Sequence, residues 1–139
     1  MTSRLAGEPG PERLDALVAA ARAVRERAYA PYSNFPVGAA VLAGGDVFAG
    51  CNVENAAYSP TLCAERVAVG SAVAAGHRTI EAVAVVGPHA PITPCGLCRQ
   101  VLHEFGPDMI VVSEGDGGER RVRSLAELLP HAFGPKDLA

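Results

Sequence analysis

The amino-acid sequence predicts an α/β fold, a three-layer α/β/α sandwich around a mixed sheet of about five strands. Along the 139 residues, a helix and a hairpin are followed by strands and helices in alternation. This order suits a sheet that is covered by helices on both faces. Two strand segments, IEAVAVV and MIVVS, consist mainly of apolar and β-branched residues, which is typical of strands buried on both sides.

The N-terminal part of the chain predicts one helix and one hairpin. Apolar residues recur at helical spacing over residues 14–28, Pro11 suits the first turn of this helix, and Arg25 suits its end. The segment FPVGAAVLAGGDVFAGCNV then predicts two strands that are joined by a glycine-containing turn at residues 43–46.

Strand and helix patterns alternate through the rest of the chain. We expect, in order, a helix from about Thr61 to Ala75 that stops at Gly76, the strand IEAVAVV, a helix from about Pro94 to Phe105, the strand MIVVS, a last strand at RRVR, and a short helix in SLAELLPHAF capped by Ser124. No linker or internal repeat divides these elements. Residues 11–139 are therefore expected to form a single domain, after a flexible tail over residues 1–10 that is rich in glycine and proline.

Composition narrows the class of partner and the compartment. The formal net charge is −3 and the densest basic run is ERRVR, so nucleic acid, which is bound through many Lys and Arg contacts to phosphates, is not expected as a partner. No apolar run reaches the roughly 20 residues that span a bilayer, and no membrane association is expected. The first residues lack the apolar core of a signal peptide. We therefore expect a cytoplasmic protein whose cysteines serve a metal or catalysis rather than disulfides.

Cysteines stand at the predicted starts of two helices. Cys95 and Cys98 are three residues apart, so within one helical turn both thiolates can hold the same ion. A tetrahedral zinc ion needs further ligands. Cys63 is a better candidate than Cys51, because a helix N-terminus lowers the pKa of a thiol, whereas Cys51 falls in a strand as a small buried residue. Three thiolates leave one position open, as in catalytic zinc sites.

Simpler interpretations exist for each of these residues taken alone. The CGLC pair by itself also fits a redox dithiol or a zinc knuckle. Glu65 by itself fits a first-turn carboxylate that complements the helix dipole. Next to Cys63 and the PCGLC pair, we interpret Glu65 as a proton carrier beside zinc-activated water, a role that raises rates by roughly 10²–10⁴-fold. Surface or packing roles are expected for the histidines, which follow no ligand spacing: His77, His89, His103 and His131.

These motifs resemble those of the zinc-dependent nucleoside and base deaminases, in which Cys or His, one residue and Glu are followed later by Pro-Cys-x-x-Cys. The segments YAPYSNFPVGAAV, GCNVENAAYS, LCAER, PCGLCRQVL and LLPHAFGPKDL are similar to those of small-subunit cytidine deaminases. The resemblance extends from about Tyr29 to Leu138. It implies a hydrolase of pyrimidine salvage that converts cytidine, and also 2′-deoxycytidine, to uridine or deoxyuridine and ammonia.

The resemblance also implies roles for individual residues. Cys63, Cys95 and Cys98 would hold one zinc per subunit, and Glu65 would carry the proton. The implied substrate contacts are Asn52 and Glu54 to the ribose hydroxyls, Phe35 against the pyrimidine, the backbone N–H of Ala64 to the base, and Phe133 donated into the site of a neighbouring subunit of a homotetramer. Without the resemblance, Asn52 and Glu54 fit one exposed strand end equally well, and both phenylalanines fit core or tail-docking aromatics.

Arg66 and Arg99 bear on the charge of the expected site. Three thiolates around a divalent zinc leave a net charge of −1, which a guanidinium that donates to sulfur would offset. The resemblance assigns this contact to Arg66, and we expect Arg66 to provide the main offset. For Arg99, a similar contribution and the role of a solvated helix arginine stay open.

Two other functions fit part of the pattern. A deaminase of the same fold would act on a modified nucleoside, a cytosine-bearing antibiotic or a nucleic-acid base, although NVEN followed by CAER favours the plain nucleoside. A non-catalytic zinc module would need a fourth protein ligand, and Cys51 would then join the other three cysteines.

Overall fold

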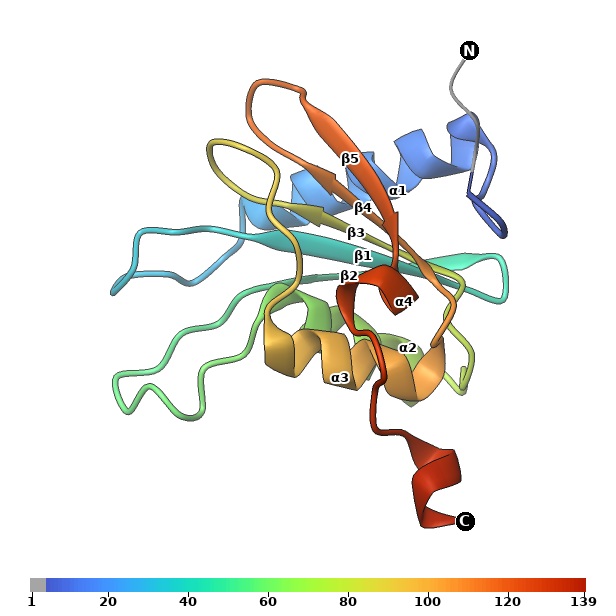
Figure 1. The fold of residues 1–139 in the computed structure, drawn as a ribbon. Helices are drawn as coiled ribbons and strands as arrows, with labels where there is room; N and C mark the ends of the chain where they lie inside the picture. The colour runs from blue at the N-terminus through green and yellow to red at the C-terminus, as the bar shows by residue number, and fades with distance from the viewer. Residues whose placement is uncertain (1–4) are drawn as a thin grey trace.

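The computed structural model describes residues 5–139, and residues 1–4, part of the predicted tail, lie outside the described residues. The elements are α1 (Pro11–Arg25), β1 (Gly38–Ala43), β2 (Asp46–Cys51), α2 (Ala64–Ala74), β3 (Ala82–Val86), α3 (Gly96–Phe105), β4 (Ile110–Glu114), β5 (Arg120–Ser124), α4 (Leu125–Leu128) and a final 3₁₀ helix (Pro135–Leu138) (Figure 1). Apart from the final 3₁₀ helix, which was not predicted, their order is the one predicted from the sequence.

The strands form one mixed sheet in the order β2-β1-β3-β4-β5. Strand β1 is antiparallel to both β2 and β3, β3 is parallel to β4, and β4 is antiparallel to β5. The parallel pair is joined by a crossover through α3, as parallel neighbours require. At the β1–β2 turn, Gly44 and Gly45 have φ values of 59° and 84°, which matches the two left-handed positions of a tight hairpin.

Helices cover both faces of this sheet, so the predicted three-layer sandwich is confirmed (Figure 1). Helix α1 lies on one face, and α2 and α3 lie on the other. Strand β3 is buried throughout, and its side chains contribute to a hydrophobic core on each face of the sheet. Val83 and Val85 face α2 and α3, whereas Ala82, Ala84 and Val86 face α1, because successive side chains of a strand point to opposite sides.

Two predicted helix boundaries are wrong for reasons that the structure makes plain. Helix α2 begins at Ala64 rather than near residue 61, because Leu62 and Val53 pair in an isolated β-bridge. The last helix ends at Leu128 instead of continuing toward the C-terminus, because Pro130 has no N–H and disfavours helical backbone before it. The predicted Ser124 cap is confirmed, since its side chain accepts a hydrogen bond from the N–H of Glu127 at 3.2 Å.

The structure around α1 can be compared with two predictions, the flexible N-terminal tail and the end of the first helix. Leu5 is half-buried against the core on the α1 side, and its N–H donates to Glu8 Oε1 at 2.9 Å. Flexibility of the tail stays a prediction. Helix α1 ends at Arg25, a basic residue that we expected at its end, although the apolar pattern continues to residue 28. Among residues 5–139, no helix has the length and apolar character that a membrane span requires.

Candidate active site

The starts of α2 and α3 carry the three cysteines of the predicted site. Cys63 is the N-cap of α2 and Cys95 is the N-cap of α3, both with extended backbone. Cys98 lies in the first turn of α3 and is buried. Pro94 immediately precedes the second N-cap. Proline has no N–H and is tolerated at the start of a helix but not in its interior, so it favours a helix start here. Each helix therefore turns its positive dipole end toward its own cysteines.

The three sulfur atoms form one cluster. The Sγ atoms of Cys63, Cys95 and Cys98 all lie within 4.8 Å of one another, and those of Cys63 and Cys95 are 3.9 Å apart. Within residues 5–139, no other group of three or more His, Cys, Asp or Glu side chains is placed to hold a metal ion. Cys51, half-buried at the end of β2, is outside the cluster. The predicted convergence of the two helix starts is confirmed.

The chemistry of the cluster fits a divalent cation. A hydrogen bond from Cys98, opposed by burial and assisted by Arg66, lowers the pKa of Cys63 to about 5. The same hydrogen bond, together with burial, raises the pKa of Cys98. The neighbouring protein groups thus favour the thiolate of Cys63 and disfavour that of Cys98. Zinc binds as many as four thiolates and displaces their protons on binding, so the donor set matches this ion.

Arg66 in the first turn of α2 brings positive charge to the cluster. Its Nη2 donates to the carbonyl of Thr61 at 2.8 Å and to Cys63 Sγ at 3.9 Å. Its buried Nε has no hydrogen-bond partner among the described residues. The contact that we expected between Arg66 and a thiolate is therefore present, and its effect on metal affinity and activity stays a prediction.

Arg99 in the first turn of α3 follows neither of the two interpretations left open by the sequence. Its nitrogens donate to the carbonyl of Pro94 at 2.7 Å, the carbonyl of Leu128 at 2.7 Å and the hydroxyl of Thr93 at 2.9 Å. The side chain is half-buried. Arg99 is neither a donor to sulfur nor a solvated arginine, but is tied to the chain on both sides of α3.

A cavity of about 390 Å³ opens at the sulfur cluster. Most of the residues predicted for the site line it: Phe35, Asn52, Glu54, Cys63, Ala64, Glu65 and Cys95. Its remaining wall includes Ser33, Val37, Ile92 and Thr93, which the sequence analysis did not single out. Segments from four separate parts of the chain thus meet around one space that holds two of the three sulfurs.

Glu65 lines this cavity from the first turn of α2 and is only 5 % exposed. Burial raises the pKa of its carboxyl group to about 7, because a charged carboxylate is poorly solvated there. A carboxyl group with a pKa near neutrality can both accept and return a proton at physiological pH. The predicted proton carrier is therefore placed beside the sulfur cluster and in a suitable environment.

Asn52 connects the cavity to the loop that carries Phe35. Its Oδ1 accepts a hydrogen bond from the N–H of Val37 at 2.9 Å, and its Nδ2 donates to the carbonyl of Phe35 at 2.9 Å. The side chain is almost fully buried. These two contacts leave one N–H and one lone pair of the amide for a ligand. Asn52 thus holds the Phe35 backbone in place as well as facing the cavity.

Glu54 holds the same loop from its other end. Its carboxylate accepts hydrogen bonds from the N–H of Tyr32 at 2.9 Å, the N–H of Ser33 at 3.1 Å and the hydroxyl of Ser33. These bonds, chiefly the one from the Ser33 hydroxyl, lower the pKa of Glu54. The Ser33 hydroxyl also accepts from the N–H of Phe35, a local turn pattern of Ser that signals a fixed loop.

Phe133 does not line the cavity of its own chain. It is 58 % exposed, and its carbonyl accepts a hydrogen bond from Gln100 Nε2 at 2.9 Å. Figure 1 shows the C-terminal segment passing α3 and ending well away from the sheet. Within one chain, Phe133 thus lies outside the cavity, and its donation into the site of a neighbouring subunit stays a prediction.

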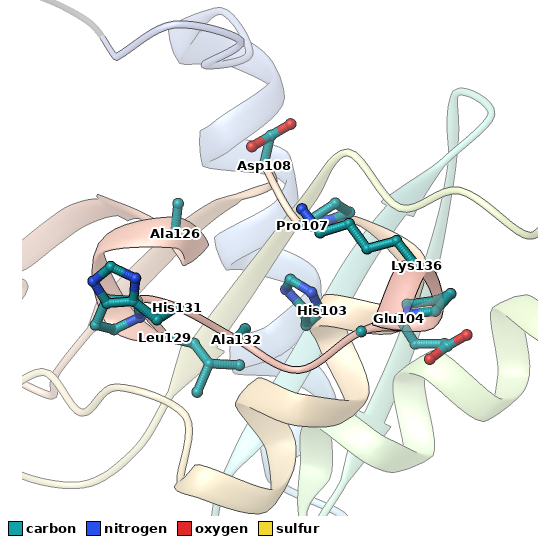
Figure 2. A pocket seen from close by; sticks show the side chains of 12 residues that line it. His103, Glu104, Pro107, Asp108, Ala126, Leu129, His131, Ala132 and Lys136 are labelled. Carbon is teal, nitrogen blue, oxygen red and sulfur yellow. The ribbon is translucent and has the colours of Figure 1, made fainter. Parts of the chain in front are cut away.

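A second cavity, of about 470 Å³, lies between the C-terminal half of α3, α4 and the C-terminal segment (Figure 2). Its lining includes His103, Glu104, Asp108, His131 and Lys136. Across the described part of the chain, these side chains form no group with metal-ligand spacing. The histidines therefore do not compete with the cysteines, and the cysteine cavity is the candidate active site.

Comparison with known proteins identifies the family. Residues 11–114 match the family model described as the cytidine and deoxycytidylate deaminase zinc-binding region. The cytidine deaminase of Sporosarcina psychrophila is 47% identical over 129 residues, which cover 91% of this chain and 95% of the relative. That of Mycobacterium tuberculosis is 46% identical over 113 residues, covering 80% and 82%.

Solved structures agree in fold as well as in sequence. The crystal structure of cytidine deaminase from Burkholderia pseudomallei superimposes with a TM-score of 0.82 at 56% identity, covering 86% of this chain and 98% of that one. That of cytidine deaminase from Mycobacterium leprae gives 0.73 at 41% identity, covering 85% and 98%. The chain therefore belongs to the zinc-binding family of cytidine and deoxycytidylate deaminases.

Proposed function

We propose that this protein is a cytidine deaminase, which hydrolyses cytidine to uridine and ammonia and accepts 2′-deoxycytidine in the same way. The observation that carries the proposal is the single cavity of about 390 Å³ into which Cys63, Cys95 and Glu65 all open. Relatives that are named cytidine deaminase, at 39–47% identity over about four fifths or more of the chain, support the choice of substrate.

Cys63, Cys95 and Cys98 would hold the zinc ion in this proposal. Three protein ligands leave one position of a tetrahedral ion free, which is the arrangement of a catalytic rather than a structural site. When bound, zinc supplies Lewis acidity that makes water nucleophilic at neutral pH. Arg66, which donates to Cys63 Sγ, would offset the negative charge of the three thiolates.

Glu65 would move the protons of the reaction. Its carboxylate takes a proton from the attacking water, whose oxygen bonds to carbon 4 of the cytosine ring. The carboxyl group delivers this proton to the ring nitrogen. It then takes the second proton from the hydroxyl group now on carbon 4 and delivers it to the amine, so that a carbonyl forms at carbon 4, the carbon–nitrogen bond breaks and ammonia leaves. A pKa of about 7 supports both halves of this cycle.

The nucleoside would be held by the cavity residues other than the cysteines and Glu65. Phe35 offers an aromatic face to the pyrimidine, and the N–H of Ala64 at the start of α2 offers a donor to the base. A carboxylate has about four lone-pair sites, and on Glu54 three of them are already occupied by protein donors. The remaining site, with the free amide positions of Asn52, would receive the ribose hydroxyls.

The assembly is part of the same proposal. Phe133 is exposed and outside its own cavity, which supports its donation into the site of a neighbouring subunit in a homotetramer. Residues 11–139 would act as one catalytic domain of each subunit. We place the enzyme in the cytoplasm, where a reducing environment keeps three adjacent thiols available for a metal. Light scattering on the purified protein would test the tetramer.

A turnover assay tests the function. The purified protein is expected to convert cytidine to uridine, followed by ultraviolet absorbance, to lose this activity with a zinc chelator, and to regain it when zinc is added. A panel of modified nucleosides and cytosine-bearing antibiotics is run in parallel. Turnover of a panel member but not of cytidine would redirect the substrate, and a zinc-loaded protein without any turnover would favour a non-catalytic zinc module.

A further inference from the structure

Arg99 has no part in the proposed chemistry, yet each of the three nitrogens of its guanidinium group donates a hydrogen bond. It reaches two acceptors just before the α3 helix, the carbonyl of Pro94 and the hydroxyl of Thr93, and one acceptor at the end of α4, the carbonyl of Leu128. All three are neutral oxygen atoms. The contacts are therefore suited to fixing positions rather than to balancing the charge of the thiolates.

The two acceptors before α3 belong to the segment that leads into the metal site. Pro94 immediately precedes Cys95 and is buried, and Thr93 lines the active-site cavity. Cys95 is the exposed member of the three cysteines, so the packing that immobilises Cys98 does not hold it to the same extent. A backbone contact at residue 94 consequently has direct influence on where Cys95 Sγ stands.

The third acceptor, the carbonyl of Leu128, lies at the end of α4, where the C-terminal segment begins. Beyond Leu128, the chain follows the outer face of α3, where Gln100 Nε2 donates to the carbonyl of Phe133. His103, one turn further along, packs so closely on Gly134 that a Cβ atom there would lie 2.7 Å from its ring. Figure 2 shows His103 facing this segment at the second cavity. Helix α3 thus carries zinc ligands at its start and the C-terminal segment along its side.

We propose that Arg99 is a positioning residue for the metal site: it joins the segment before Cys95 to the end of α4, so that the placement of Cys95 Sγ depends on the docking of the C-terminal segment. The inference rests on the proposed function only in that the three cysteines hold the zinc ion. It adds a physical link between that ion and the segment that carries Phe133, which the proposal assigns to a neighbouring active site.

The requirement is for the shape of arginine and not for its charge alone. A guanidinium has several N–H donors in one rigid plane and can bind acceptors on different segments at once, whereas the ammonium of lysine is a compact donor on a flexible stem. Arg99→Lys would therefore keep the charge but lose most of the link. Arg99→Met would lose both and keep a side chain of similar length.

The test measures metal binding in the purified full chain. Zinc affinity is determined by competition with a chelator, and the Co²⁺-loaded protein is examined by absorption spectroscopy, because its bands report the geometry of thiolate ligands. Arg99→Met is expected to weaken zinc binding about 10-fold and to shift the Co²⁺ bands. Arg99→Lys is expected to bind zinc only slightly more tightly than Arg99→Met, so that less than half of the loss in the logarithm of the zinc affinity is recovered. Arg123→Gln is the matched control, since Arg123 is exposed on β5 and donates only to the adjacent Val122 carbonyl.

The outcomes separate this inference from the proposed function. Folded Arg99→Met protein with wild-type affinity and spectrum would overturn the role of Arg99, and so would full recovery by Arg99→Lys. If Arg99→Met does not fold, Thr93→Val, which removes one acceptor, decides instead: a smaller loss of zinc affinity supports the link and an unchanged affinity overturns it. A wild-type chain that binds zinc but leaves cytidine unchanged would refute the function and leave the metal-binding result for Arg99 standing.

Discussion

The two helix starts that form the metal site have similar local structure, but their first-turn arginines make different contacts. Each begins with a cysteine N-cap, and each has a first-turn arginine that folds back to the carbonyl five residues earlier, Arg66 to Thr61 and Arg99 to Pro94. At the start of α2, the same nitrogen of Arg66, Nη2, also donates to a sulfur, Cys63 Sγ. At the start of α3, the remaining donors go to Leu128 and Thr93.

Under the proposed function, this difference suits α2 to charge and proton transfer and α3 to ligand placement. Helix α2 carries Glu65, whose buried carboxyl group has a raised pKa, and Arg66, which contacts the thiolate. Helix α3 carries two of the three sulfurs and no acidic residue in its first turn. We therefore expect substitutions on α2 to change turnover and charge, and substitutions on α3 to change metal binding and its geometry.

Removal of a sulfur from α3 should have the largest effect. Cys98→Ala leaves two thiols, too few for the proposed site, so we expect loss of stoichiometric zinc and of measurable turnover. Cys51→Ala is the matched control, because Cys51 lies outside the cluster. Metal content by elemental analysis measures both variants. Loss of zinc from Cys51→Ala would show that a fourth cysteine completes the site and would support the structural zinc module.

Loss of the carboxylate on α2 should come next and should separate chemistry from metal binding. Glu65→Gln keeps the shape of the side chain and removes the proton carrier, so kcat is expected to fall by roughly 10²–10⁴-fold while zinc content stays at the wild-type level. Glu104→Gln, an exposed carboxylate on α3, should behave as wild type. A Glu65→Gln protein with wild-type kcat would remove Glu65 from the mechanism.

The packing of α2 on the sheet should have the next largest effect, on stability. A Cβ atom at Gly50 would lie 2.5 Å from the backbone nitrogen of Ala68 and 2.8 Å from the carbonyl oxygen of Ala64, so Gly50→Ala has to push α2 away from β2. We expect the free energy of unfolding to fall by about 1–3 kcal/mol, measured by urea denaturation, with reduced turnover because Glu65 moves with its helix.

Gly96 gives the matched glycine at the start of α3. No atom lies within 4 Å of a Cβ built there, so Gly96→Ala should leave stability unchanged or raise it by up to about 1 kcal/mol. Equal destabilisation by both substitutions would show that α2 is no more tightly held against the sheet than α3, and the contrast between the two helix starts would lose its structural basis.

The sequence predicted the parts of this arrangement that depend on local pattern and on known ligand chemistry. The order of the elements along the chain, the buried central strands and the choice of Cys63 over Cys51 followed from apolar runs, helix starts and spacing. The links of Ser33 to Glu54 and of Arg99 to Leu128 did not, because they join residues 21 and 29 positions apart. Their partners are backbone and side-chain groups brought together only by the path of the loops, which no periodicity encodes.

The two arginines can also be compared directly. Arg66→Gln removes positive charge from the thiolates without cutting the segment before Cys95, so zinc affinity and kcat are each expected to fall about 10-fold while the Co²⁺ bands keep their positions. Arg99→Met is expected to weaken binding by a similar factor but to shift those bands. Since both variants lose one positive charge, the spectra and not the affinities distinguish them. Identical spectral changes in the two variants would mean that charge alone connects either arginine to the metal site, and that α3 has no separate role in placing its ligands.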